Sequence, residues 1–158
     1  MGCGCFGVYG RRDFVILIGH EVGRWVAARN HQMYHEANSQ SIGLEKDGKI
    51  VAGVIYENWN GQSIVVHIAI LGNLTPTFVA KIFDYAFRQL AAHKVIAPVA
   101  SINSESIRLV SNMGFKEEAN IKDAHLSGDI VIFTMTKKDC RFLGERYGKR
   151  LTTSTSTA

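Results

Sequence analysis

The stretch Asn103–Phe115 reads NSESIRLVSNMGF, and it predicts one short helix between two strands. Ile107, Val110 and Met113 recur at three-residue spacing, which gives this helix an apolar face. Ser104 stands where an N-cap residue is expected, and Gly114 stands where a left-handed residue ends a helix at the least cost. The stretch therefore indicates a strand exit, a capped helix and a new strand that begins at Phe115.

The residues before this helix form a short apolar run, Val95–Ala100, of the kind that a buried strand shows. Pro98 lies inside the run and has no N–H to donate to a neighbouring strand. We therefore expect either an edge strand or a strand that splays away from its neighbour at this position.

The order of strand, Asn-x-x-Ser, helix and Gly-Phe resembles a conserved block of the GNAT-superfamily N-acetyltransferases. The continuation Phe115–Ala124 is similar to the branch that acetylates the N-termini of ribosomal proteins, and Asp129–Met135 resembles the last core strand of that branch. The resemblance extends from about Ser41 to Cys140. The short chain, altered phosphate loop and basic tail also resemble small acetyltransferase-like proteins of bacteriophages.

The rest of the chain completes this pattern. The expected fold is α/β (α+β), with a central, mostly antiparallel, V-shaped sheet of about seven strands and about four helices. The V should open between Gln62–Ile70 and Val95–Ala100. Beyond the segments already named, the expected strands are Asp13–Ile18, Ser41–Glu45, Lys49–Glu57 and Gln62–Ile70, with turns at Lys46–Gly48 and Asn58–Gly61, and the expected helices are Glu21–Asn30 and Thr75–Ala92.

Composition fits one globular domain with a tail. The chain has 158 residues, of which 46% are hydrophobic, and no apolar run approaches the roughly 18 residues of a membrane span. Cys3, Cys5 and Cys140 fit neither a disulfide framework nor zinc spacing, so a reducing cytoplasm is expected. We assign residues 1–140 to the domain and residues 141–158 to a basic, then Ser/Thr-rich, tail that is partly disordered.

The basic charge is concentrated near the C-terminus. Between Lys137 and Arg150 six cations and two anions give the segment a net charge equal to the +4 of the whole chain. This segment is either a solvated tail or a contact surface for nucleic acid or another acidic partner. No membrane partner is expected, and the resemblance allows a homodimer.

The resemblance implies acetyl-CoA as a co-substrate whose pyrophosphate lies at the N-terminus of the Thr75–Ala92 helix. Here the chain departs from the family, because the loop Leu71–Pro76 keeps one glycine, Gly72, and Pro76 supplies no N–H. The remaining amides and two threonine hydroxyls are then left to hold the phosphates. The expected coenzyme-binding residues are Ile68, Ala69, Ile70, Gly72, Asn73, Thr75, Thr77, Asn103 and Ser106.

The expected reaction is transfer of acetyl to a primary amine, which must lose a proton before it attacks. His67 is the preferred base because imidazole accepts a proton near neutrality, and Glu57 is the second candidate, as a base through water or as a hook for a cationic substrate. The alternatives are a hydrogen-bonded structural histidine and a solvated glutamate. Val110 occupies the place of a tyrosine that protonates the leaving thiolate in many relatives, and the ribosomal-protein branch commonly lacks this tyrosine; a general acid is helpful here rather than obligatory.

Two further alternatives stay open at this point. The acceptor is expected to be a protein, through its N-terminus or a lysine, although a small amine would fit equally, and a fold that has lost turnover and only binds a partner is the rival class. His31 and His35 are four residues apart, which is either a pair of metal ligands or a surface pair. Because no third ligand is evident, no metal is expected.

Overall fold

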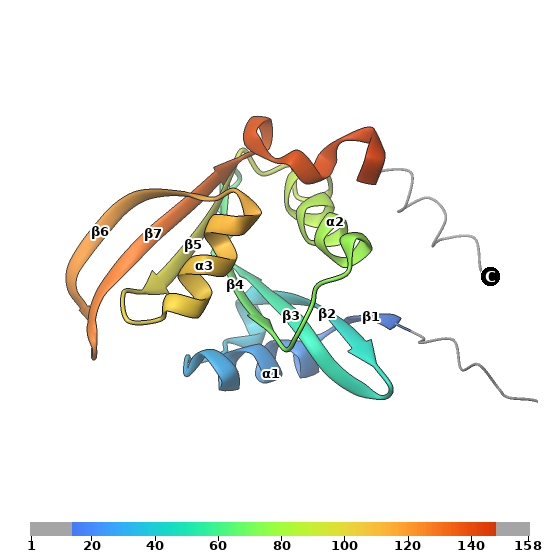
Figure 1. The fold of residues 1–158 in the computed structure, drawn as a ribbon, viewed down its shortest axis with the longest axis horizontal. Coiled ribbons are helices and arrows are strands. Elements are labelled where there is room, and N and C mark those ends of the chain that lie inside the picture. Colours follow the sequence, from blue (N-terminus) through green and yellow to red (C-terminus); the bar gives the residue numbers. More distant parts are fainter. Residues whose placement is uncertain (1–13, 148–158) are drawn as a thin grey trace, which may run out of the picture.

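A computed structural model describes residues 14–147, which form one seven-stranded sheet with strand order β1-β2-β3-β4-β5-β7-β6 (Figure 1). The strands are β1 (Phe14–Ile18), β2 (Ser39–Lys46), β3 (Lys49–Glu57), β4 (Ser63–Ile70), β5 (Lys94–Ala100), β6 (Lys116–His125) and β7 (Gly128–Thr136). The α-helices are α1 (His20–Asn30), α2 (Pro76–Asp84) and α3 (Ser104–Met113). Short 3-10 turns lie at Glu36–Asn38, Lys137–Asp139 and Arg141–Leu143.

The sheet opens between its two central strands. All neighbouring strands are antiparallel except β4 and β5, which run parallel and pair only from Ser63–Val65 to Lys94–Ile96. Beyond this short ladder the two strands part, and Pro98 lies in the part of β5 that β4 does not accompany. The predicted V-shaped, mostly antiparallel sheet is confirmed, and β5 is a splayed central strand rather than an edge strand.

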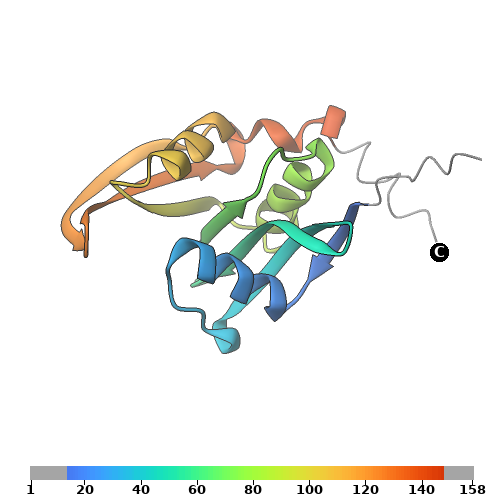
Figure 2. The ribbon, with the colours of Figure 1, turned by 60° about the horizontal axis from the view of Figure 1, so that its bottom comes forward.

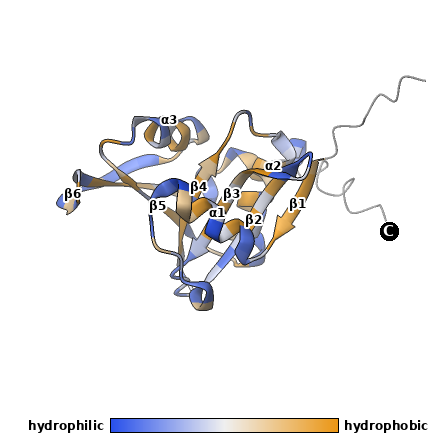
Figure 3. Ribbon diagram, turned by 90° about the horizontal axis from the view of Figure 1, so that it is seen from below, coloured by the Kyte–Doolittle hydropathy of each residue, from blue (hydrophilic) through white to orange (hydrophobic). Residues whose placement is uncertain are grey.

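Helices cover the two faces of the sheet unequally. Helix α1 lies across β2, β3 and β4 on one face, and it does not extend over β6 and β7 (Figure 3). Helices α2 and α3 pack on the other face, where their apolar residues join one core with alternate residues of every strand from β2 to β5 and of β7. A second, smaller core lies under α1 and consists of Val22, Val26, Ala27, Ile55 and Ala69.

Two glycines let α1 lie close to the sheet. Gly43 and Gly53 face each other across β2 and β3. A Cβ atom at Gly43 would lie 2.7 Å from Val22, and one at Gly53 would lie 2.6 Å from Val26. Contacts this short do not occur, so any larger residue would push the helix outward. The glycine pair thus sets the distance between α1 and the sheet.

Helix α2 is shorter than the sequence pattern predicts. The α-helix ends at Asp84 and continues as a π-helical turn, Tyr85–Gln89, closed by the Leu90 N–H donating to the Tyr85 carbonyl. Ala91 then adopts a left-handed φ of 54°, which ends the helical path before Ala92. The apolar spacing of these residues fits a π-helical turn as well as an α-helix, so this spacing does not predict where the α-helix ends.

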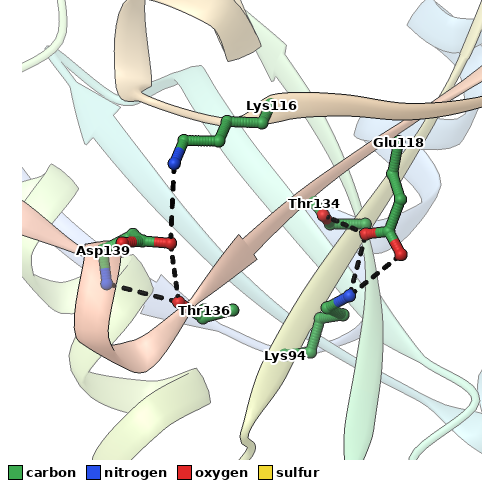
Figure 4. Close-up of polar contacts among 6 residues, drawn as sticks. All are labelled: Lys94, Lys116, Glu118, Thr134, Thr136 and Asp139. Carbon is green, nitrogen blue, oxygen red and sulfur yellow. Dashed lines mark hydrogen bonds and ion pairs between the residues drawn. The ribbon is translucent and has the colours of Figure 1, made fainter.

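Strands β6 and β7 form a long hairpin at the end of the sheet opposite β1 (Figures 1 and 2). All ten residues of β6 are exposed, and two irregularities interrupt its pairing with β7. A polar network joins β6 to the central strands: Lys94 Nζ donates to Glu118 at 2.8 and 3.0 Å, and Thr134 Oγ1 donates to Glu118 at 2.5 Å (Figure 4). Lys116 also lies 3.9 Å from Asp139.

The described part of the C-terminal segment packs on α2. Phe142 is buried and stacks on Phe83 with ring centroids 5.1 Å apart, and Tyr147 meets Phe142 edge-on. Arg88 donates to the Leu143 carbonyl at 2.7 Å, which ties this segment to the π-helical turn that follows α2. Cys3, Cys5 and most of the predicted basic tail lie outside the described residues, and the domain boundary at residue 140 stays a prediction. Within residues 14–147 no helix is both long and apolar enough to cross a membrane.

Candidate functional site

A cleft occupies the place where β4 and β5 part. It has a volume of about 240 Å³ and lies between Val66–Ile68 of β4, Ala97–Ala100 of β5 and helix α3. A second, more polar cavity of about 710 Å³ adjoins it at the end of β4, beside the loop Leu71–Leu74. The two cavities share Asn30, Ile68, Asn103, Ser106 and Leu109, so they form one continuous groove along the open edge of β4.

The two predicted catalytic residues form a pair at this cleft. His67 Nε2 lies 2.7 Å from Glu57 Oε1, and the two side chains are 16% and 18% exposed. His67 lines the cleft, whereas Glu57 lies on β3 and is not one of the lining residues. The β3–β4 register pairs Ile55 with His67 and Glu57 with Val65, so the two side chains are diagonal neighbours on one face. Alternation along β4 puts His67 on the α1 face, together with Ala69.

This contact fixes which imidazole nitrogen is available. An ionised carboxylate only accepts hydrogen bonds, so the proton between the two groups belongs to His67 Nε2. The neutral imidazole then keeps its lone pair on Nδ1. Glu57 thereby orients the ring and leaves Nδ1 as the nitrogen that can accept a hydrogen bond.

Asn103 has a structural role that the sequence pattern assigned to Ser104. Asn103 is the N-cap of α3, and its Oδ1 accepts a hydrogen bond from the Ser106 N–H at 3.0 Å. The predicted Ser104 cap is wrong by one residue, because Ser104 is already the first helical residue. Gly114 ends the helix with φ 102°, as predicted. The Asn103 Nδ2 group remains as a donor beside both cavities.

The loop after β4 is divided between the groove and the helix. Gly72 and Asn73 line the larger cavity together with Ile68, Ala69 and Ile70. Thr75 and Thr77 are not among the residues that line either cavity. Thr75 Oγ1 accepts a hydrogen bond from the Phe78 N–H at 3.2 Å, so this hydroxyl caps α2. The structure thus brings together all the predicted coenzyme-binding residues except these two threonines.

The open edge of β4 already has one hydrogen-bond partner. Asn30 Nδ2, at the end of α1, donates to the Ile68 carbonyl at 3.3 Å. Asn30 therefore occupies a backbone acceptor within the groove, a contact that the sequence pattern did not predict.

The histidine pair His31 and His35 does not share a helix face. Helix α1 ends at Asn30, His31 has a left-handed φ of 52°, and His35 is extended. Instead, His31 lines the cleft together with His67 and with His125 from the β6–β7 hairpin. Among residues 14–147 no group of three or more His, Cys, Asp or Glu side chains is placed to hold a metal ion.

The residues at the groove fit an acetyl-CoA arm in most respects. The parted strands leave an apolar slot, Asn103 offers an amide donor, and Gly72 has φ 85° with no atom within 4 Å of where a Cβ would stand. A phosphate group could therefore come close to the backbone at Gly72. Arg29 and Arg108 also line the larger cavity, and the sequence motifs did not indicate either of them. No local pattern in the sequence identifies this pair, because Arg29 and Arg108 belong to two helices that are far apart in the chain.

Solved structures similar to this chain include acetyltransferases. A mutant form of the spermidine/spermine N-acetyltransferase SpeG from Vibrio cholerae matches 87% of this chain and 99% of its own, at 16% identity and a TM-score of 0.64. A chimera of the Vibrio cholerae SpeG with hSSAT, described as a spermidine N-acetyltransferase, matches 83% of this chain and 99% of its own, at 15% identity and a TM-score of 0.64.

A third similar structure is described as a probable acetyltransferase, and it matches 81% of this chain and 95% of its own, at 16% identity and a TM-score of 0.61. No protein-family model and no curated protein sequence matches the chain. At these identities the structural likeness shows the fold. The chain therefore has the fold of the GNAT acetyltransferases, as the resemblance around Asn103–Phe115 predicted.

Proposed function

We propose that the chain is an acetyl-CoA-dependent N-acetyltransferase that transfers acetyl directly to a primary amine. The observation that carries this proposal is the His67–Glu57 pair on the wall of the cleft where β4 and β5 part. A base held by a carboxylate, on the wall of an open cleft, is suited to remove a proton from an attacking amine. The cytoplasm remains the expected location.

The proposed step uses His67 as the base. The protonated amine gives one proton to His67 Nδ1, and its nitrogen then forms a bond to the acetyl carbon and releases its second proton to water. The carbon–sulfur bond breaks, and the sulfur leaves as a thiolate. A thiolate is a stable leaving group near neutral pH, with a reference thiol pKa of about 8.5. Val110 is buried and offers no proton, so the thiolate takes its proton from water.

The acceptor that we favour carries a single positive charge. Two of the similar structures are named for spermidine, a polyamine, and these names favour a small amine over a protein acceptor. In the described part of the chain no Asp or Glu lines the cleft, and Glu57 is engaged by His67. A polyamine needs carboxylates for its further charges. We therefore favour a small monoamine as the acceptor, and a protein N-terminus or lysine is the second candidate.

Calorimetric titration with acetyl-CoA tests the proposal. The native chain should bind it at micromolar concentration. Asn103→Asp keeps the oxygen that caps α3 but removes the Nδ2 donor and adds a negative charge, so it should weaken binding, whereas Asn103→Ala loses the cap as well. Thermal melts of both variants separate lost binding from lost helix stability. If the native chain does not bind acetyl-CoA, the enzyme assignment fails, and a binding protein that retains only the fold becomes the better assignment.

Acetyl transfer to a panel of small monoamines, polyamines and peptides tests the role of the pair. His67→Gln should lower kcat by about 10²- to 10⁴-fold, the usual contribution of a general base. Glu57→Gln keeps a hydrogen bond to the ring but loses the charge. If Glu57 acts by orienting the ring, this variant should keep a larger share of the native kcat than His67→Gln does, because the imidazole keeps a hydrogen-bond partner. A His67→Gln enzyme with the native rate and pH profile would show that His67 is a structural residue.

A further inference from the structure

The N-terminus of α2 offers few groups to a phosphate. Pro76 has no N–H, the Phe78 N–H donates to Thr75 Oγ1, and the Val79 N–H donates to the Thr75 carbonyl. Within the first turn this leaves the N–H of Thr77 as the unused donor. Anion binding at a helix N-terminus depends on several such N–H groups pointing at the ligand. The phosphates of a coenzyme therefore need another source of positive charge.

Two arginines line the larger cavity from opposite sides of the groove. Arg29 lies in the last turn of α1, and Arg108 lies on α3. Both are exposed, and the cavity between them also contains Gly72 and Asn73. Among the described residues that line this cavity, Glu105 is the one carboxylate, so the lining carries a net positive charge.

The surroundings of Arg29 hold its guanidinium near the groove. The guanidinium lies 4.6 Å from the centre of the Trp25 ring, one turn earlier on α1. Such a cation–π contact restricts the side chain while leaving its N–H groups free to donate. Asn30, the next residue, reaches the Ile68 carbonyl, so the end of α1 is already anchored at the groove.

We propose that Arg29 and Arg108 bind the phosphate groups of the coenzyme in place of the α2 N-terminus. This inference rests on the proposed function. A guanidinium presents paired N–H groups that match phosphate oxygens, and it is less strongly hydrated than an ammonium. The pyrophosphate then lies in the larger cavity beside Gly72, while the acetyl-pantetheine arm follows β4 toward His67. The site recognises a phosphorylated acyl carrier and not the thioester alone.

The test compares two ligands by calorimetry: acetyl-CoA, which carries the phosphates, and S-acetyl-pantetheine, which lacks them. Arg29→Gln and Arg108→Gln should each weaken acetyl-CoA binding by about 10-fold or more, as expected for a lost charge-assisted hydrogen bond. Binding of S-acetyl-pantetheine should not change. Glu105→Gln should strengthen acetyl-CoA binding, and added salt should weaken it less in the arginine variants than in the native chain.

Arg24→Gln is the matched control, because Arg24 lies on α1 outside both cavities and pairs with Glu36. It should bind both ligands as the native chain does. Arg29→Lys and Arg108→Lys guard against a folding defect, since they keep the charge and lose only the fork geometry.

Three results would overturn the inference. Native affinity for acetyl-CoA in both arginine variants would place the phosphates elsewhere and leave the proposed function intact. An equal loss of S-acetyl-pantetheine binding would show that the arginines only maintain the shape of the groove. No binding of either ligand by the native chain would remove the proposed function itself, and the inference with it.

Discussion

The two halves of the sheet differ in how they are covered. In β3 the neighbouring residues Val54 and Ile55 point to opposite faces and are both 0% exposed, because α2 covers one face and α1 the other. In β7 the neighbours Phe133 and Ile132 differ: Phe133 is buried in the core that α2 and α3 cover, whereas Ile132, on the α1 side, is only half-buried. One half of the molecule is closed on both faces, and the other is open on one.

The candidate site lies on the border between these halves. His67 and Glu57 belong to the closed half, where α1 and the paired strands hold them in place. The cleft that His67 lines extends over β5 to Ile130 of β7, in the open half. Rigid support on one side and an accessible face on the other is what a site needs if it is to position a base and still admit a substrate.

Truncation of matched isoleucines would show this difference most strongly. Ile55→Ala leaves a cavity under α1 and should destabilise the chain by about 2–5 kcal/mol. Ile132→Ala removes a half-buried side chain from the open face and should cost about 1 kcal/mol or less. Denaturant unfolding of both variants, analysed with a common slope, measures the two costs. Equal costs would mean that another part of the molecule covers the open face.

Enlarging the glycine under α1 should have the next largest effect. Gly53→Ala places a Cβ 2.6 Å from Val26, and overpacking of this kind costs about 1–3 kcal/mol. Gly144→Ala is the matched control, because its nearest neighbour would be 3.8 Å away and its φ is −66°. Thermal melts should separate the two variants clearly. A Gly53→Ala protein as stable as the control would show that α1 can move outward freely.

The smallest expected effect is a pH dependence at β6. Hydrogen bonds from Lys94 and then from Thr134 hold the pKa of the Glu118 carboxyl below its usual value. This contribution to stability is complete above the unfolded pKa of about 4.3, and it is lost as the pH falls through the lower folded pKa. Unfolding midpoints from pH 7 to pH 3 should therefore fall less steeply for Glu118→Gln than for the native chain. Identical curves would remove Glu118 from the acid response.

Much of the fold could be predicted from local signals. The Asp47–Gly48 dipeptide correctly predicted the turn of one hairpin, and Gly114 correctly predicted the end of α3. Each position has a positive φ, which few residue types adopt easily. Pro98 correctly indicated the splayed strand. The π-helical turn after Asp84 was not predictable, since apolar spacing does not separate it from an α-helix.

The site was only half predictable. His67 and Glu57 were found separately by their chemistry, but their contact depends on the β3–β4 register, which the Asn58–Gln62 loop sets. The Asn60 side chain accepts from the Gln62 and Ser63 N–H groups in that loop at 2.9 and 2.8 Å. Arg29 and Arg108 were missed because their approach depends on how α1 and α3 pack, which no local pattern encodes.

The exposed strand β6 has a consequence for how copies of this chain meet in solution. An edge strand carries a row of unpaired backbone groups and invites a second strand to add to it. Five of the ten residues of β6 are charged, and two irregularities bend its ladder. A neighbouring chain would find no straight register along this edge and would have to bring charged side chains into contact, so β6 is a poor template for aggregation although nothing in residues 14–147 covers it.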